Sequence, residues 1–169
     1  MADRLLYVVD GYNVLHALYP GLEKDDLADK RQWLIDQLAS LAAARSASVT
    51  LVFDARGRQG STSQPVKGAA VEVVFAGGRL GADTLIARRI ADQPTDVTVI
   101  VVSADQEVQR AAARAGVSRM TPRELGLEMS SLATELALSP DMSTIRSTLE
   151  DKVDVETLRR LEEMRTKQD

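Results

Sequence analysis

The sequence of 169 residues contains no cysteine and a single histidine, His16. Without cysteine, neither a disulfide framework nor a thiolate zinc site can form. One histidine cannot supply a histidine-rich metal site. A basic surplus is also missing, because 21 lysines and arginines stand against 25 acidic residues, for a formal net charge of −4. This balance argues against a general nucleic-acid binder, which usually carries a basic surplus, but it leaves room for a local basic rim around an acidic site.

Long apolar runs are absent as well. No segment reaches the roughly 20 apolar residues of a membrane-spanning helix, and no apolar stretch follows a basic leader at the N-terminus. The absence of cysteine fits a reducing compartment. We therefore expect a cytoplasmic protein without a membrane partner.

Three widespread functional motifs are missing from the chain. It has no glycine-rich loop ending in Lys-Ser or Lys-Thr, no dinucleotide-binding glycine fingerprint and no serine nucleophile elbow. These absences exclude a P-loop protein and argue against the other two classes.

Short apolar runs alternate with segments of helical periodicity along most of the sequence. The runs are too short for useful helices and predict buried strands over residues 5–9, 49–53, 71–75, 97–102 and 117–120. The periodic segments predict helices near residues 26–45, 81–92, 104–115 and 122–138. This alternation is typical of a parallel sheet with helices on both faces. We therefore predict one α/β domain over residues 1–138 and a C-terminal helical extension over residues 139–169.

Two segments have the composition of turns or loops. Asp10-Gly11 is a turn signal, and a polar connection through Pro20-Gly21 is expected to lead to the first helix. The segment from Arg56 to Lys67 is rich in glycine, serine, glutamine and arginine and has no periodicity. It predicts a mobile surface loop.

Four aspartates are expected to meet at one edge of the sheet. Asp10 and Asp54 directly follow the first two strands, and the carboxyl ends of parallel strands form the edge where open α/β sheets bind ligands. Asp83 and Asp105 begin the sheet-facing side of their helices. A simpler alternative is that Asp10 caps a turn and that Asp83 and Asp105 only stabilise the positive ends of their helices.

Clustered carboxylates repel one another and raise one another's pKa values, so such a cluster usually binds a hard cation. Oxygen ligands of this kind predict Mg²⁺ or Mn²⁺. Asn13 could add a carbonyl ligand or orient a metal-bound water, and Ser103 could hydrogen-bond a carboxylate, contact substrate or cap the next helix. A site of this type suits phosphodiester cleavage, because the ion activates water and neutralises charge on phosphate oxygens.

Basic residues outnumber acidic ones, six to four, between Asp54 and Asp92. Arg56 and Arg58 directly follow an acid at the expected edge of the sheet, and Lys67 closes the same predicted loop. We therefore predict that these three side chains bind the substrate's phosphates.

Five motifs in this order and spacing resemble the YacP-like NYN domains, which are relatives of the PIN-domain nucleases. The motifs are Asp10-Gly11-Tyr12-Asn13, Val52-Phe53-Asp54-Ala55, Ala82-Asp83, Ser103-Ala104-Asp105 with Gln109, and Thr121-Pro122-Arg123-Glu124-Leu125. Two positions depart from the family pattern. Leu80-Gly81 stands where the family often has Glu-Thr, and Val108 stands where it usually has Glu.

The resemblance implies a PIN-like sheet with the strand order 3-2-1-4-5. It also implies a metal-dependent endoribonuclease, with Asp10, Asp54, Asp83 and Asp105 as metal ligands and Asn13 as an assisting catalytic residue. Some relatives act on mRNA at the ribosome, so the expected partners are single-stranded RNA, mRNA in particular, and the ribosome. Two alternatives stay open: an RNA- or ribosome-binding module of the same fold with little or no cleavage, and a metal-dependent phosphatase acting on small molecules.

Overall fold

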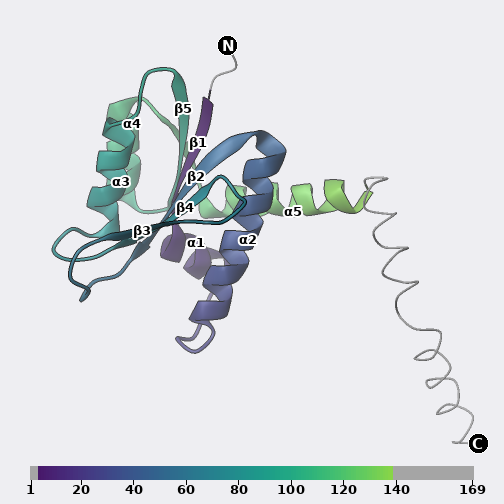
Figure 1. The fold of residues 1–169 in the computed structure, drawn as a ribbon, viewed down its shortest axis with the longest axis horizontal. Coiled ribbons are helices and arrows are strands. Elements are labelled where there is room, and N and C mark those ends of the chain that lie inside the picture. Colours follow the sequence, from purple (N-terminus) through teal and green to yellow (C-terminus); the bar gives the residue numbers. More distant parts are fainter. Residues whose placement is uncertain (1–3, 139–169) are drawn as a thin grey trace, which may run out of the picture. The chain divides into compact units, whose positions relative to one another are not determined.

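Strands and helices alternate along the chain in the computed structural model, which describes residues 4–138 (Figure 1). The elements are β1 (Arg4–Asp10), α1 (Gly11–Leu18), α2 (Leu27–Arg45), β2 (Ala47–Asp54), β3 (Thr62–Pro65), β4 (Val71–Ala76), α3 (Ala82–Ala91), β5 (Val97–Val102), α4 (Gln106–Ala115), β6 (Ser118–Met120) and α5 (Pro122–Leu138). The predicted α/β class is confirmed.

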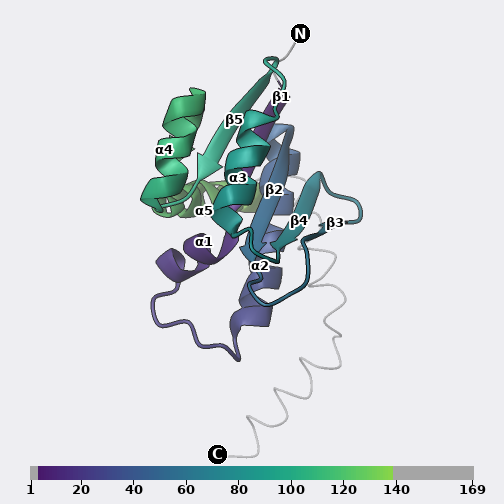
Figure 2. The same ribbon diagram turned by 90° about the vertical axis from the view of Figure 1, so that its left-hand side faces the viewer.

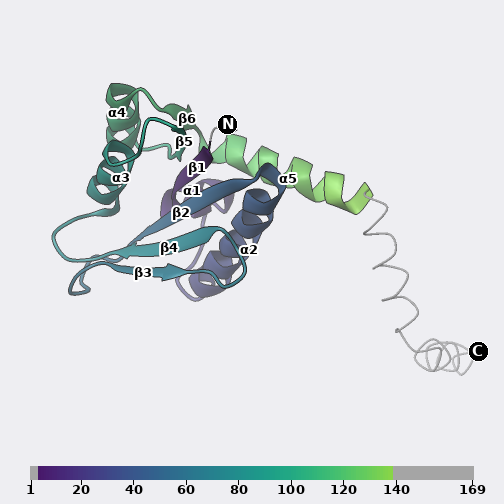
Figure 3. The same cartoon turned by 45° about the horizontal axis from the view of Figure 1, so that its top comes forward.

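The strands form one sheet in the order β3-β4-β2-β1-β5-β6 (Figure 3). All neighbouring strands are parallel except β3 and β4, which are antiparallel. The five predicted strands thus have the predicted order, with β1 in the middle and β3 added at one edge. Asp10 pairs with Val52, and Asp54 pairs with Ala76, so β1, β2 and β4 end at the same edge of the sheet.

Helices cover both faces of the sheet. Figure 2 shows α3 and α4 in front of one face, while α1 and α2 contact the strands from the other. Side chains alternate along β1: Leu6 and Val8 belong to the core under α3 and α4, and Tyr7 and Val9 point the opposite way. Val8 and Val9 are fully buried, and burying one such side chain contributes about 1.5–3 kcal/mol.

Two segments that we predicted to be irregular contain regular elements. The turn expected at Asp10-Gly11 is the start of α1, because Asp10 keeps an extended backbone as the N-cap residue and the helix buries Val14 and Leu15 completely. The loop expected over residues 56–67 contains β3, whose four residues are all exposed. Backbone pairing with β4, rather than apolar burial, holds this strand in place.

Gly11 lies directly against the ring of Phe53. A Cβ atom on Gly11 would lie 2.4 Å from the ring of Phe53, and Phe53 has no exposed surface into which it could move. We expect Gly11→Ala to destabilise the protein by about 1–3 kcal/mol through overpacking. Urea unfolding of the metal-free protein measures this change. An unchanged unfolding midpoint would show that the ring and helix can shift freely.

The chain divides into two compact units, Met1–Ser130 and Ser131–Asp169. At the start of α5, Thr121 Oγ1 accepts a hydrogen bond from Glu124 N (3.2 Å) and Glu124 Oε2 accepts one from Thr121 N (2.7 Å), which is a capping box. The predicted helical extension over 139–169 lies outside the described residues, and the predicted domain boundary stays a prediction.

Among the helices within residues 4–138, none has the length and apolar character needed to cross a membrane.

Candidate functional site

The structure places all four predicted aspartates at the carboxyl edge of the sheet. Asp10 ends β1 and Asp54 ends β2, while Asp83 lies in the first turn of α3 and Asp105 is the N-cap residue of α4. Their charges act on one another, because Asp83 and Asp105 raise the pKa of Asp10 and Asp105 and Asp54 raise the pKa of Asp83. The four carboxylates therefore share one electrostatic environment.

Asp10 is the buried acid of this group, with 8% of its surface exposed. Burial is the main cause that raises its pKa from 3.8 to about 6. A hydrogen bond from Ser103 Oγ to Asp10 Oδ2 (3.1 Å) opposes the rise, and the charges of Asp83 and Asp105 add to it. Asp10 is thus a carboxylate whose ionised form is costly in the absence of a cation.

Ser103 and Asn13 position Asp10 and Asp105 through hydrogen bonds. Ser103 is 1% exposed, and its hydroxyl, besides donating to Asp10, accepts a hydrogen bond from Asp105 N (3.0 Å). Asn13 Oδ1 accepts a hydrogen bond from Ala104 N (2.7 Å). The structure thus shows one of the roles considered for Ser103, the hydrogen bond to a carboxylate. The side chains of Ser103 and Asn13 both support the turn between β5 and α4.

Asp105 itself caps α4. Its Oδ1 accepts hydrogen bonds from Glu107 N (2.8 Å) and Val108 N (3.3 Å), which is the simpler alternative for this residue, while Oδ2 stays outside the cap. Glu107 is a further acid near the site, since its charge also raises the pKa of Asp83. We did not predict it from the sequence. Its position in the first turn of α4, two residues after Asp105, was the available signal.

Asp83 is exposed on the first turn of α3. Desolvation contributes most to the rise of its pKa, followed by the charges of Asp105 and Asp54, and the Arg56 guanidinium opposes that rise. Capping is not its role, because the N-cap residue of α3 is Gly81 and no side-chain hydrogen bond caps this helix.

Arg56 lies directly beside the site. Its Nε is 2.9 Å from Asp54 Oδ2, and its backbone N donates to Asp54 Oδ1 (3.2 Å). The Arg56 side chain is 78% exposed, so it reaches solvent from the rim of the acidic edge. Arg58 lies nearby, with its guanidinium carbon 5.4 Å from the ring centroid of Phe75.

Lys67 does not join these two arginines. It lies in the turn between β3 and β4, and the antiparallel pairing of those strands puts this turn at the amino edge of the sheet. The four residues of β3 carry the chain roughly 13 Å away from the acidic edge. The sequence could not show this, because the strand that separates Lys67 from Arg58 has no apolar pattern.

The donor set fits a divalent ion that keeps part of its water. Within residues 4–138, no three histidine or acidic side chains lie close enough to hold one ion by themselves. In the same part of the chain, Asp54 is the only one of the four aspartates that forms an ion pair, and buried charges in proteins are usually paired or coordinate metals. Magnesium is commonly bound through one or two carboxylates and several waters, and the oxygen donors at this edge match that preference.

The sheet is mostly parallel and carries acids at the carboxyl edge of its central strands, which defines an α/β domain with a candidate site at that edge. The family model for the YacP-like NYN domain matches residues 7–166, and the chain belongs to this family. The resemblance inferred from the motifs is therefore confirmed.

Two crystal structures of Rae1 (YacP) from Bacillus subtilis are similar to the chain. One has a TM-score of 0.69 at 24% identity and covers 95% of this chain and 94% of that chain. The other is of a point mutant and has a TM-score of 0.67 at 24% identity. It covers 88% of this chain and 86% of that chain. At this identity the likeness supports the fold. A comparison with curated proteins found no match.

Proposed function

We propose that this protein is a divalent-metal-dependent endoribonuclease that cleaves single-stranded RNA at the acidic edge of its sheet. The observation that carries the proposal is the placement of four carboxylates from four elements at one edge of the sheet, of which the most buried, Asp10, has no cationic partner within the described residues. Membership of a family with a nuclease-type fold supports hydrolysis of RNA as the reaction.

The residues divide into ligands and supports. Asp10, Asp54, Asp83 and Asp105 would hold Mg²⁺ or Mn²⁺ directly or through water. When bound, the ion would lower the pKa of water and neutralise charge on the phosphate. Ser103 keeps Asp10 in place through its hydrogen bond.

Asn13 fixes the turn that carries Asp105 by accepting the hydrogen bond from Ala104 N. Arg56 shields Asp54 in the metal-free protein through their ion pair. The pair uses Nε and the Arg56 side chain is 78% exposed, so the rest of the guanidinium can contact a phosphate with or without a bound ion.

The natural substrate that we propose is mRNA, with the ribosome as partner and the cytoplasm as location. The substrate and the partner come from the resemblance to the family, whereas the location comes from the absence of cysteine and of long apolar runs in the sequence. The net charge of −4 repels RNA at long range, so the local arginines at the rim must guide the strand to the acids.

A second candidate function is an RNA- or ribosome-binding module with little or no cleavage. The absence, within residues 4–138, of three side chains close enough to hold an ion directly favours this candidate. Incubation of the purified protein with labelled single-stranded RNA in Mn²⁺, Mg²⁺ or EDTA separates the two. The endoribonuclease predicts internal cleavage that stops in EDTA. Binding without cleavage would establish the module, and release of phosphate from mononucleotides alone would indicate the small-molecule phosphatase.

The positions of the basic residues give a prediction about RNA binding. Phosphate contacts make affinity fall with salt, by about 0.7 logarithmic units of affinity per unit of log salt for each charge on a single strand. The double variant Arg56→Ala/Arg58→Ala should therefore flatten the slope by about 1.4. Lys67→Ala, at the opposite edge, is the matched control and should leave the slope unchanged. Binding measured in EDTA over a range of salt checks both, and a slope that changes only in Lys67→Ala would place the RNA path at the other edge.

A further inference from the structure

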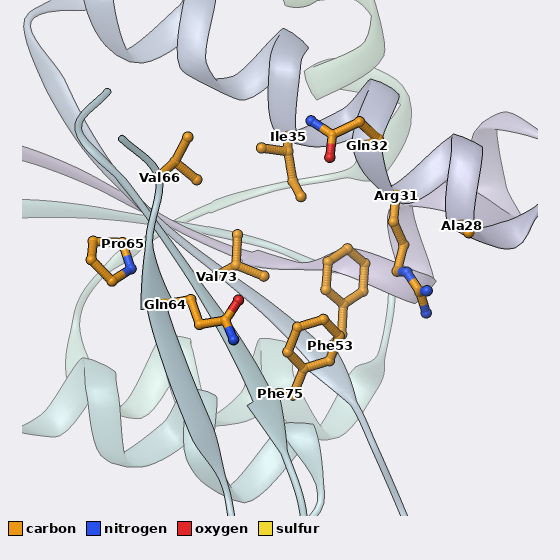
Figure 4. Close-up of a pocket in the computed structure, with 10 residues that line it drawn as sticks. All are labelled: Ala28, Arg31, Gln32, Ile35, Phe53, Gln64, Pro65, Val66, Val73 and Phe75. Atoms are coloured by element: carbon orange, nitrogen blue, oxygen red, sulfur yellow. The ribbon is translucent and has the colours of Figure 1, made fainter. Parts of the chain in front are cut away.

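A cavity of about 350 Å³ lies between α2 and the β2-β4-β3 side of the sheet (Figure 4). Its volume falls within the range of small-molecule and cofactor sites, about 300–1,000 Å³. None of the four aspartates lines it. The residues that matter for its chemistry are Arg31, Gln32 and Ile35 of α2, Gln64 of β3, and Val73 and Phe75 of β4.

The floor of the cavity is apolar and partly aromatic. Phe75 is half-buried, and the ring of Phe53 stacks against it with a centroid distance of 5.6 Å and an angle of 26°. Phe53 is fully buried and also packs against Tyr12, at 4.8 Å between ring centroids. Val73 and Ile35 complete this surface. A flat ligand entering the cavity meets a fixed aromatic wall.

The polar groups of the cavity come from two opposite sides. Figure 4 shows the amide of Gln64 on the sheet side and that of Gln32 on the helix side. Gln64 makes no side-chain hydrogen bond within residues 4–138. Gln32 Nε2 donates to Asp36 Oδ1 (2.9 Å), which leaves its carbonyl oxygen as an acceptor. Donors and acceptors on both sides of a flat apolar space match the edges of a planar heterocycle.

Charge favours a ligand attached to phosphate. Arg31 lines the cavity and no acid does, although the chain as a whole is acidic. Arg31 Nη1 donates to the Tyr12 hydroxyl (2.9 Å), so its guanidinium has a defined place. The guanidinium of Arg58 lies over the ring of Phe75, which lines the cavity.

The cavity is built from the neighbours of the acidic-site residues. Phe53 directly precedes Asp54, and Tyr12, which packs on Phe53, directly precedes Asn13. Side chains alternate along β2, so Phe53 points to the α2 face and Asp54 to the opposite one. Because Asp54 is the last residue of β2, a strand of RNA whose phosphate lies at Asp54 would pass around the carboxyl end of the sheet to place an adjoining base against Phe75.

We propose that this cavity binds one nucleobase of the RNA strand that is cleaved at the acidic edge. Single-stranded RNA is commonly recognised by stacking of unpaired bases on aromatic side chains and by hydrogen bonds to their edges. Phe75 supplies the stacking surface, Gln64 and Gln32 supply the hydrogen-bonding groups, and Arg31 and Arg58 receive the flanking phosphates. This proposal rests on the proposed function, because it concerns the same substrate.

The test uses the full chain, short single-stranded RNAs and metal-free buffer, so that binding is measured without cleavage. In each RNA a different nucleotide lacks its base. For the wild type, one abasic position should weaken binding by about tenfold, within the range for loss of one stacked base. Ala28→Trp fills the cavity from an exposed position that lines it. In this variant the effect of that abasic position should disappear, and Gln64→Ala should reduce it.

The matched control is Ala44→Trp, which adds the same ring to an exposed position of α2 away from the cavity. It should bind every RNA as the wild type does. Equal affinities for all abasic RNAs, or equal behaviour of Ala28→Trp and Ala44→Trp, would overturn the base pocket and leave the cavity to a peptide or small molecule. Cleavage in Mn²⁺, measured separately, decides whether the endoribonuclease itself stands.

Discussion

Replacement of Asp10 by asparagine should abolish Mn²⁺-dependent cleavage of single-stranded RNA. Asp10 ends the central strand β1, is 8% exposed and receives the hydrogen bond from Ser103. Asparagine has nearly the same shape and can still accept that bond, but it lacks the charge that a divalent ion requires. We expect the cleavage rate to fall by roughly 100-fold or more, the scale for loss of one electrostatic or acid–base group.

Two measurements make this result specific to the site. Circular dichroism should show a folded variant, and RNA binding in EDTA should stay close to that of the wild type. The matched control is Asp96→Asn, which neutralises an exposed aspartate in the turn before β5, at the amino edge. Cleavage by Asp10→Asn at the rate of the wild type would contradict the proposed mechanism.

The same substitution should make the metal-free protein more stable at neutral pH. The pKa of Asp10 rises from 3.8 to about 6 on folding, chiefly because the carboxyl group is buried. Between these values the folded state binds more protons than the unfolded state, so stability falls as pH rises. The favourable contribution of protonated Asp10 is complete below pH 3.8 and is lost as pH passes about 6. Above that pH the ionised carboxylate costs about 1–3 kcal/mol.

Asp10→Asn removes this cost, and about 1 kcal/mol corresponds to a Tm shift of roughly 2–4 °C in a chain of this size. Thermal unfolding in EDTA at several pH values should therefore show a stabilised variant near pH 7.5 and a gap that closes toward pH 4. Added Mn²⁺ should stabilise the wild type, which binds the ion in its native state, and should affect the variant much less. A gap of equal size at pH 4 and pH 7.5 would show that Asp10 is not the titrating group.

The sequence predicted the sheet well because apolar runs report burial directly. The central strands β1 and β2 are buried on both faces over most of their length, so their runs of valine, leucine and phenylalanine indicate strands clearly. It missed α1 because Asp10-Gly11 has turn chemistry, whereas Gly11 is required by its contact with the Phe53 ring. It missed β3 because Thr62–Pro65 is exposed throughout and is defined by a partner strand.

The candidate site shows the same division between what a pattern can and cannot reveal. Asp10 and Asp54 followed from their places at strand ends, and the structure puts them at one edge. The hydrogen bonds of Ser103 and Asn13, which make them supports, connect residues about 90 positions apart and could not be read from local spacing. We grouped Lys67 with Arg58 because they are close in sequence, but strand β3 lies between them and carries Lys67 to the opposite edge of the sheet.

The most direct test of the proposed metal site is a crystal of the protein soaked in Mn²⁺ and measured for anomalous scattering. We expect a peak beside Asp10 and among Asp54, Asp83 and Asp105, with ligand oxygens from one or two of these carboxylates and from water. The peak should vanish in Asp10→Asn crystals soaked in the same way. Clear manganese peaks elsewhere on the molecule with none beside Asp10 would contradict the metal site, and with it the proposed mechanism of cleavage.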